Sequence, residues 1–198
     1  MISRMDEDGL PAAAQALANA FMDDPLEKYT FPDEDERRAK APGHFAAALR
    51  YGLKFGEVYA AADGAGASIW LKPGETEITP ERAIEGGFGE LPAVMGENAF
   101  NRFFTALNFA EENHKRDASE HHWYTMVLGV DPAFQGRGFG RSLLEPVMDR
   151  ARADGTPVYL ETAQPKNVSF YEKMGFRVLR ELVEPSSSLP MWTFRFDP

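Results

Sequence analysis

The segment from residue 123 to residue 151 constrains the fold of this chain more than any other. Its first part, residues 123–130 (WYTMVLGV), is rich in aromatic, β-branched and large apolar residues and ends at a turn-forming Asp-Pro pair, which predicts a buried strand. Apolar residues then recur at helical spacing from Leu143 to Ala151, which predicts an amphipathic helix. Residues 135–140 (QGRGFG) lie between them. The chain therefore passes from strand to helix through alternating glycines.

Alternating glycines let the backbone turn tightly and let successive N–H groups face one point. Such a nest at the start of a helix binds phosphate oxygens. The spacing differs from the two familiar phosphate loops, because GxxxxGK[ST] is absent and Gly136, Gly138 and Gly140 do not form GxGxxG. Two interpretations are open on these residues alone: a phosphate-binding loop, or a glycine turn that only joins strand to helix.

The pattern QxxGxG between an apolar strand and an amphipathic helix resembles the acyl-CoA pyrophosphate loop of the GNAT superfamily of N-acetyltransferases. Residues 160–162 (LET) and 167–176 (NVSFYEKMGF) are similar to the last strand, helix and strand of that superfamily. These motifs are most similar to those of the puromycin N-acetyltransferases. The resemblance covers about residues 121–196, whereas the N-terminal half matches weakly.

The resemblance implies an α/β (α+β) fold in which helices flank a central, mixed, mostly antiparallel twisted sheet, with splayed central strands that hold acyl-CoA. We expect one domain over residues 1–198, with residues 1–120 mainly on the acceptor side and residues 121–198 mainly on the acetyl-CoA side. The implied activity is acetyl transfer from acetyl-CoA to a small-molecule amine by direct attack in a ternary complex. The alternative is a non-catalytic module that binds acyl-CoA and regulates a partner.

The same resemblance implies roles for particular residues. The backbone N–H of Leu128 polarises the thioester carbonyl, and Tyr171 protonates the departing thiolate. Glu161, at the end of a predicted strand, is the expected base or amine-orienting carboxylate, with Tyr124, Glu112 or a water relay as alternatives. The expected donor-binding residues are Met126, Val127, Leu128, Gly129, Val130, Gln135, Gly136, Arg137, Gly138, Phe139, Gly140, Arg141, Asn167 and Tyr171.

Three of these residues have a second interpretation. Arg137 and Arg141 offer charge to phosphates, although arginines beside a glycine turn are usually only solvated; Arg137 is the preferred candidate. Asn167 either hydrogen-bonds the pantetheine arm or caps the short helix that follows it.

Composition excludes several classes of function. The chain has no cysteine, so it has no disulfide framework, thiolate metal site or cysteine nucleophile. Its net charge of −10 disfavours nucleic acid and anionic membranes as partners. The acidic N-terminus lacks a signal-peptide core and no stretch reaches membrane-spanning length, so we expect a cytoplasmic protein. We expect it to be a monomer or a homodimer.

Histidines cluster near residue 120. His114, His121 and His122 lie close in sequence to three glutamates, but no recognisable ligand spacing completes a metal site, so we expect none and assign the histidines to the surface or the edge of a pocket. The neighbouring glutamates are Glu111, Glu112 and Glu120.

The N-terminal half predicts helices around one hairpin. We expect helices over residues 10–22 and 39–54, with the charged run 33–38 as a loop, and a hairpin of strands 58–62 and 68–71. A further helix is expected near residues 98–109. Four aromatic residues in the first two expected helices and the loop between them either line the acceptor pocket or, as we prefer for each, pack in the core: Phe21, Tyr29, Phe31 and Phe45.

Overall fold

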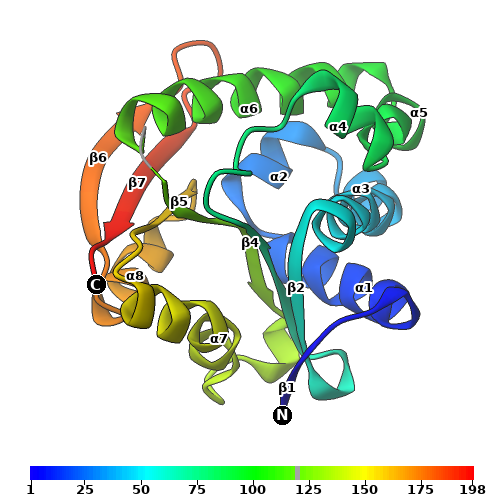
Figure 1. Cartoon of the computed structure of the whole chain (residues 1–198). Coiled ribbons are helices and arrows are strands. Elements are labelled where there is room, and N and C mark those ends of the chain that lie inside the picture. Colours follow the sequence, from blue (N-terminus) through cyan, green and yellow to red (C-terminus); the bar gives the residue numbers. More distant parts are fainter. Residues whose placement is uncertain (119–120) are drawn as a thin grey trace.

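The structure is a computed structural model that describes residues 1–118 and 121–198. Its sheet has seven strands in the order β1-β2-β3-β4-β5-β7-β6 (Figure 1). The strands are β1 (Ile2–Arg4), β2 (Gly56–Ala61), β3 (Gly66–Leu71), β4 (Trp123–Val130), β5 (Val158–Thr162), β6 (Arg177–Val183) and β7 (Pro190–Phe196). Only β4 and β5 pair in parallel, and every other neighbouring pair is antiparallel. The expected mixed, mostly antiparallel sheet is confirmed.

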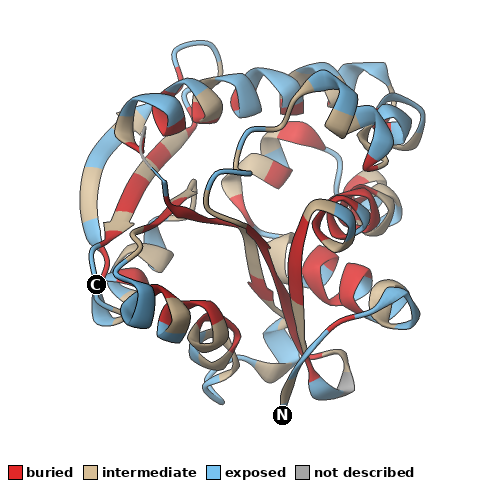
Figure 2. Cartoon of the chain, viewed as in Figure 1, coloured by how far each residue is buried: buried red, intermediate tan, exposed pale blue. Residues whose placement is uncertain are grey.

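Helices cover both faces of this sheet. They are α1 (Leu10–Phe21), α2 (Pro25–Thr30), α3 (Glu34–Phe55), α4 (Pro80–Glu85), α5 (Leu91–Met95), α6 (Glu97–Asp117), α7 (Phe139–Asp154) and α8 (Val168–Lys173). Figure 1 shows α1 and α3 on one side of the sheet, α7 and α8 on the other, and α6 across the top of the molecule. In Figure 2 the central strands and the inner faces of α1, α3 and α7 are buried, while the edge strand β6 and the outer face of α6 are largely exposed or half-buried.

Apolar side chains form separate clusters on the two faces. Leu17, Leu49 and Ile69 belong to the cluster under α1 and α3. Leu144 and Phe194 belong to the cluster under α7 and α8. Burial of these side chains removes apolar area from water, which is the main favourable contribution to folding. Each face of the sheet is therefore fixed by its own helices.

The N-terminal predictions hold for α1 and for the hairpin of β2 and β3. The predicted loop over residues 33–38 is wrong, because α3 begins at Glu34. Asp33 caps it by accepting a hydrogen bond from the backbone N–H of Glu36 at 2.8 Å. Helix α6 is also longer than expected and ends at Asp117. Phe31 and Phe45 lie in the core, 0% and 4% exposed, which supports the packing interpretation for these two.

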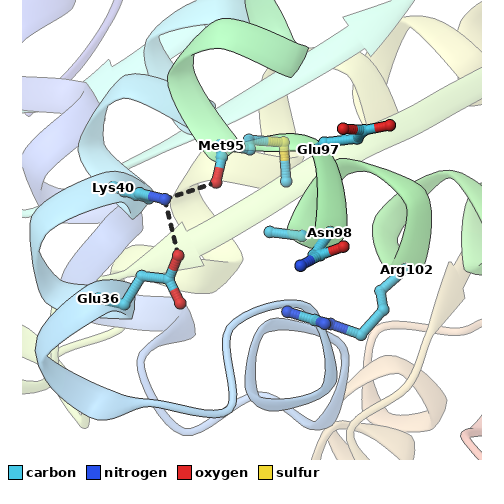
Figure 3. Close-up of a pocket in the computed structure, with 8 residues that line it drawn as sticks. Glu36, Lys40, Met95, Glu97, Asn98 and Arg102 are labelled. Atoms are coloured by element: carbon cyan, nitrogen blue, oxygen red, sulfur yellow. Dashed lines mark hydrogen bonds and ion pairs between the residues drawn. The ribbon is translucent and has the colours of Figure 1, made fainter.

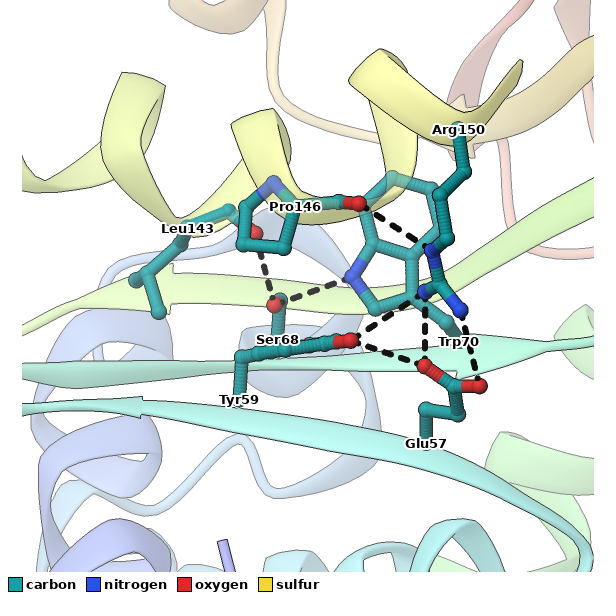
Figure 4. Close-up of polar contacts among 7 residues, drawn as sticks. All are labelled: Glu57, Tyr59, Ser68, Trp70, Leu143, Pro146 and Arg150. Carbon is teal, nitrogen blue, oxygen red and sulfur yellow. Dashed lines mark hydrogen bonds and ion pairs between the residues drawn. The ribbon is translucent and has the colours of Figure 1, made fainter. Parts of the chain in front are cut away.

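Polar contacts anchor α7 to the sheet (Figure 4). Arg150 donates two hydrogen bonds to the Glu57 carboxylate of β2, at 3.1 and 2.6 Å. The Ser68 hydroxyl of β3 donates to the carbonyl of Leu143 at 3.0 Å, next to the turn that Pro146 disturbs. Proline within a helix leaves carbonyls of the preceding turn short of donors. The contacts with β2 and β3 therefore anchor α7, which contains Pro146, against the sheet.

Candidate active site

The central strands separate after a short parallel contact. β4 and β5 pair only at Trp123 with Val158 and at Tyr124 with Tyr159. Beyond these pairs β4 stays with β3, and β5 stays with β7. The strands therefore splay, as the family resemblance implied, and the facing backbone edges of residues 125–130 and 160–162 are not joined by ladder hydrogen bonds.

A bulge lies in β4 at the start of this opening. The register with β3 shifts between Ile69, which faces Val127, and Trp70, which faces Thr125, so Met126 is the extra residue. As a result Met126 and Val127, although adjacent, both pack on the side of α1 and α3. Bulges redirect backbone groups and are common beside active sites. The edge of β4 is thus reshaped where the sequence predicted a bound thioester.

The glycine loop lies at the far end of β4 and leads into α7. Gly136 and Gly138 have φ values of 77° and 85°, a conformation that favours glycine, and a Cβ added to either would meet nothing within 4 Å. Gly138 occupies the N-cap position without a side-chain cap, and the first turn of α7 carries no acidic residue. Free N–H groups at a helix start attract anions. The loop residues therefore fit a pyrophosphate.

The arginines of this loop are engaged with the protein. Arg137 donates to the carbonyl of Ala133 at 3.2 Å, and its guanidinium lies 5.3 Å from the centre of the Phe134 ring. Arg141 pairs with Glu145 at 2.9 Å. Gln135 donates to the carbonyl of Val130 at 3.0 Å, which holds the loop against the end of β4. Both guanidinium groups stay exposed beside the loop.

A buried carboxylate lies at the closed end of the splay. The Tyr124 hydroxyl of β4 donates to Glu161 Oε1 of β5 at 2.5 Å. Glu161 Oε2 is buried and has no hydrogen-bond partner in the part of the chain that the structure describes. Burial raises the pKa of Glu161 to about 8; the bond from Tyr124 lowers the pKa and the charge of Glu111 raises it. A carboxylate with this pKa can accept a proton near neutral pH.

The two faces of the opening differ in chemistry. Tyr124 and Tyr159 belong to the cluster that also contains Tyr51 of α3, and among the described residues the buried Tyr159 hydroxyl has no hydrogen-bond partner. Trp123 instead packs with the cluster under α7 and α8. Because successive strand residues point to opposite faces, Glu161 and Tyr159 share the face of α3 and α6. The polar atoms of Glu161 and Tyr159 therefore lie on the side of the sheet opposite α7.

Tyr171 lies on the α7 and α8 side. It is 6% exposed, and its ring packs 5.3 Å from the ring of Phe194. Burial raises the pKa of the Tyr171 hydroxyl, and the charges of Asp24 and Glu161 raise it further. The phenol is therefore protonated at neutral pH, as an acid must be before it donates.

Asn167 does not cap α8 with its side chain. It occupies the N-cap position in helical conformation, without a capping hydrogen bond, so that interpretation is wrong. Its amide instead reaches back to the Thr162 hydroxyl at 3.4 Å. The side chain thus lies at the end of β5, four residues before Tyr171.

Asp24 was missed by the sequence analysis. It is 8% exposed and caps α2 by accepting from the N–H of Leu26 at 2.9 Å. Burial raises the pKa of Asp24 to about 6. The side chain of Gln164, in the β5–α8 connection, donates to the carbonyl of Asp23 at 3.4 Å. The available signal was an Asp directly before Pro25, which is typical of a helix start.

The histidine prediction was partly wrong. His121 is exposed, but His114 and His122 are buried and share a hydrogen bond between their Nε2 atoms at 2.7 Å. Burial, followed by the nearby charge of His122, lowers the pKa of His114 to about 3. Among the described residues no three histidine or carboxylate side chains gather to hold a metal ion; Glu120 lies outside those residues. The pair is structural: the ring of His114 stacks 4.4 Å from that of Tyr159.

A separate pocket of about 320 Å³ lies between the starts of α3 and α6 (Figure 3). Its two cationic groups serve the fold. Lys40 bonds to Glu36 at 2.6 Å and to the carbonyl of Met95 at 2.8 Å. Arg102 donates two bonds to the carbonyl of Thr30. The pocket contains neither the glycine loop nor Glu161, so we do not assign the chemistry to it.

Comparisons with known proteins agree with this geometry. A profile described as the acetyltransferase (GNAT) family matches residues 100–176. An uncharacterized N-acetyltransferase of Schizosaccharomyces pombe is 30% identical over 179 residues, which are 87% of this chain and 72% of that protein. The structure of arylalkylamine N-acetyltransferase 2 from Aedes aegypti aligns over 100% of this chain and 98% of its own, with a TM-score of 0.69 and 17% identity.

An agmatine N-acetyltransferase variant in its apo form aligns over 100% of this chain and 99% of its own, with a TM-score of 0.65 and 19% identity. At this identity the structural matches establish the fold alone. No helix in the described part of the chain is long and apolar enough to cross a membrane. The splayed sheet, the family profile and the extended match to the yeast protein lead to one conclusion: the chain belongs to the GNAT superfamily of N-acetyltransferases.

Proposed function

We propose that the protein transfers the acetyl group of acetyl-CoA to the amine of a small molecule. The observation that carries this proposal is the splay between β4 and β5, with the uncapped start of α7 at one end and the Tyr124–Glu161 pair at the other. The bare N–H groups and the open glycines at residues 136–140 suit a pyrophosphate. Acetyl-CoA supplies the activated acetyl group.

Each remaining requirement of acetyl transfer has a candidate residue. The edge of β4 around Leu128 offers backbone N–H groups to the thioester oxygen, where negative charge develops. The amine nitrogen attacks the carbonyl carbon, so a C–N bond forms and the C–S bond breaks. Glu161 accepts the proton that the amine loses. Tyr171 donates its proton to the sulfur that leaves.

Two buried polar atoms on the α3 and α6 face of the sheet support a class of acceptor. Within residues 1–118 and 121–198, Glu161 Oε2 and the Tyr159 hydroxyl are buried without hydrogen-bond partners, and an amine can supply donors to them. Solved structures with this fold include enzymes named for arylalkylamines and agmatine. These relatives support a small amine as the acceptor.

The direct test is an amine panel. The protein is incubated with acetyl-CoA and single amines, and free CoA is followed with a thiol reagent, which reports on CoA alone because the chain has no cysteine. We expect CoA release that depends on the amine and matches the acetylamide found by mass spectrometry. A non-catalytic acyl-CoA-binding module would bind acetyl-CoA and release no CoA with any amine.

A further inference from the structure

A buried hydroxyl lies in β4 at the point where β4 and β5 separate. Thr125 is 4% exposed, and its Oγ1 is buried without a hydrogen-bond partner among the described residues. Tyr124 is the last residue of β4 that pairs with β5, so Thr125 is the first residue of β4 beyond the ladder. The steps assigned to Leu128, Glu161 and Tyr171 leave this hydroxyl without a role.

The pairing with β3 places the Thr125 side chain on the side of the sheet that carries α7 and α8. Thr125 lies directly opposite Trp70, and residues directly opposite each other in an antiparallel pair share a face. Trp70 packs in the apolar cluster under α7 and α8, as does Trp123, two residues before Thr125 on the strand. Leu160 of β5 and Tyr171 belong to the same cluster. The side chains of Thr125 and Tyr171 therefore lie on the same side of the sheet.

Neighbouring polar groups on the β3 side already bond to one another (Figure 4). The indole N–H of Trp70 donates to the Ser68 hydroxyl at 3.0 Å, and that hydroxyl donates to the carbonyl of Leu143 at 3.0 Å. On β5, the first residue beyond the ladder is Leu160, whose side chain has no polar atom. A buried hydroxyl in a native protein almost always has a partner. We therefore expect the partner of Thr125 to come from a ligand between β4 and β5.

The sulfur of CoA is the ligand atom that suits this hydroxyl. In the proposed reaction Tyr171 gives its proton to the departing thiolate, so the sulfur belongs on the side of the sheet that Thr125 also faces. When the C–S bond breaks, its electron pair stays on sulfur, and a thiolate accepts hydrogen bonds but donates none. Thr125 offers one O–H donor, which can bond to the thiolate without transferring its proton. Two hydroxyls, one from β4 and one from α8, are thus available to one sulfur.

We propose that the Thr125 hydroxyl binds the sulfur of CoA and stabilises the thiolate that forms when the thioester breaks. The inference rests on the proposed acetyltransferase function and adds a residue to its donor side. Thr125 holds the thiolate by a hydrogen bond, and Tyr171 supplies the proton. Because negative charge appears on sulfur only as the C–S bond breaks, loss of the hydroxyl should lower kcat more than it raises the KM for acetyl-CoA.

The test compares CoA with desulfo-CoA, which lacks the sulfur atom. Calorimetry measures the affinity of each compound at about pH 9, above the ordinary thiol pKa of about 8.5. The proteins are the wild type, Thr125→Val, which keeps the shape of the side chain, and Thr125→Ser, which keeps the hydroxyl. Thr193→Val is the matched control, because Thr193 is a strand threonine with 0% exposure whose hydroxyl donates to Asp117 Oδ2 at 2.9 Å.

We expect Thr125→Val to reduce the preference for CoA over desulfo-CoA by about tenfold or more, roughly the value of one hydrogen bond to a charged group. Its kcat should fall by a similar factor. Thr125→Ser should keep both properties close to those of the wild type. Thr125→Val should not lower the melting temperature, because it removes a hydroxyl that has no partner among the described residues. Thr193→Val should lower the melting temperature, because it breaks a hydrogen bond, and should leave the preference for CoA unchanged.

An unchanged preference for CoA over desulfo-CoA in Thr125→Val would overturn the inference even if turnover fell, because the hydroxyl would then act away from sulfur. A lower melting temperature with equal losses for both compounds would also overturn it, since Thr125 would then only support the fold. Thr125→Ala gives the same comparison if Thr125→Val does not fold. Failure to acetylate any amine would refute the proposed function, whereas the calorimetric comparison needs no turnover and decides the role of Thr125 separately.

Discussion

Two substitutions near Glu161 should shift its pKa in opposite directions, and the pH dependence of activity can measure both shifts. Its pKa is raised to about 8 by burial, lowered by the Tyr124 hydrogen bond and raised by the charge of Glu111. If Glu161 accepts the proton from the amine, only its ionised form is active. The value of kcat/KM should therefore rise with pH through about 8, in the region given by that pKa.

Tyr124→Phe removes the hydroxyl that stabilises the ionised carboxylate. A hydrogen bond to a charged group is worth about 1.5 to 3 kcal/mol, and one pKa unit is about 1.4 kcal/mol, so the pKa should rise by about 1 to 2 units. Glu111→Gln removes a negative charge and should lower the pKa. That shift should be less than about one unit, because Glu111 is partly exposed and pairs with Lys115 at 3.1 Å.

The assay measures kcat/KM from about pH 6 to 10 with one amine. The ionisation of this amine affects every variant equally, so differences between the profiles report on Glu161. Glu112→Gln is the control, because this neighbouring glutamate of α6 is exposed; it also tests Glu112 as the alternative base. A downward or absent shift in Tyr124→Phe, or full activity in Glu161→Gln, would refute the reasoning.

The same group makes stability depend on pH. Glu161 titrates near its ordinary value of 4.5 in the unfolded chain and at about 8 in the native protein, so between these values the native state binds more protons. Stability therefore falls as pH rises through this window, the opposite of a salt-bridged carboxylate. Glu161→Gln should raise the melting temperature more at pH 9 than at pH 5. An equal effect at both pH values would contradict the buried, proton-retaining carboxylate.

Three further predictions concern the donor side and the anchoring of α7. Tyr171→Phe should lower turnover by about 100-fold to 10,000-fold with little change in acetyl-CoA affinity or melting temperature; a large fall in melting temperature with normal turnover would indicate a packing role instead. Gly138→Ala and Gly155→Ala place the same strain of about 1 kcal/mol at positive φ in open space, so both should lose similar stability. Only Gly138→Ala should weaken acetyl-CoA binding in calorimetry, and equal affinities would remove the loop from the donor site. Glu57→Gln should cost about 1 to 3 kcal/mol in denaturant unfolding, because Arg150 is only partly buried and keeps access to water.

Local patterns predicted most of the C-terminal half. The strand over residues 123–130 has the bounds of β4, and the helix after the glycines ends at Asp154, three residues after Ala151, the last residue of the predicted apolar pattern. These elements combine clear apolar periodicity with strong turn signals, so neighbours in sequence are enough to define them. The run of charges from residue 33 to 38 misled the prediction, because solvation describes a helix surface as well as a loop.

The sequence predicted candidate site residues within single motifs, but not the contacts that join different elements of the site. Glu161 was proposed as the base from its place at a strand end. Its hydrogen bond with Tyr124 could not be predicted, because that bond depends on the register that pairs Tyr124 with Tyr159 across the sheet. The buried pair of His114 and His122 likewise depends on how α6 lies over the start of β4. Contacts between distant elements follow from packing, which a single sequence does not specify.

The central claim is direct transfer within a ternary complex, and rapid mixing tests it most directly. The protein is mixed at stoichiometric concentration with labelled acetyl-CoA, first alone and then with an accepted amine, and CoA, acetylamide and labelled protein are quantified over time. The account predicts no CoA release and no labelled protein before the amine is added, and equal amounts of CoA and acetylamide afterwards, because the chain has no cysteine to carry an acetyl group. One equivalent of CoA released without amine, with the label on the protein, would contradict it.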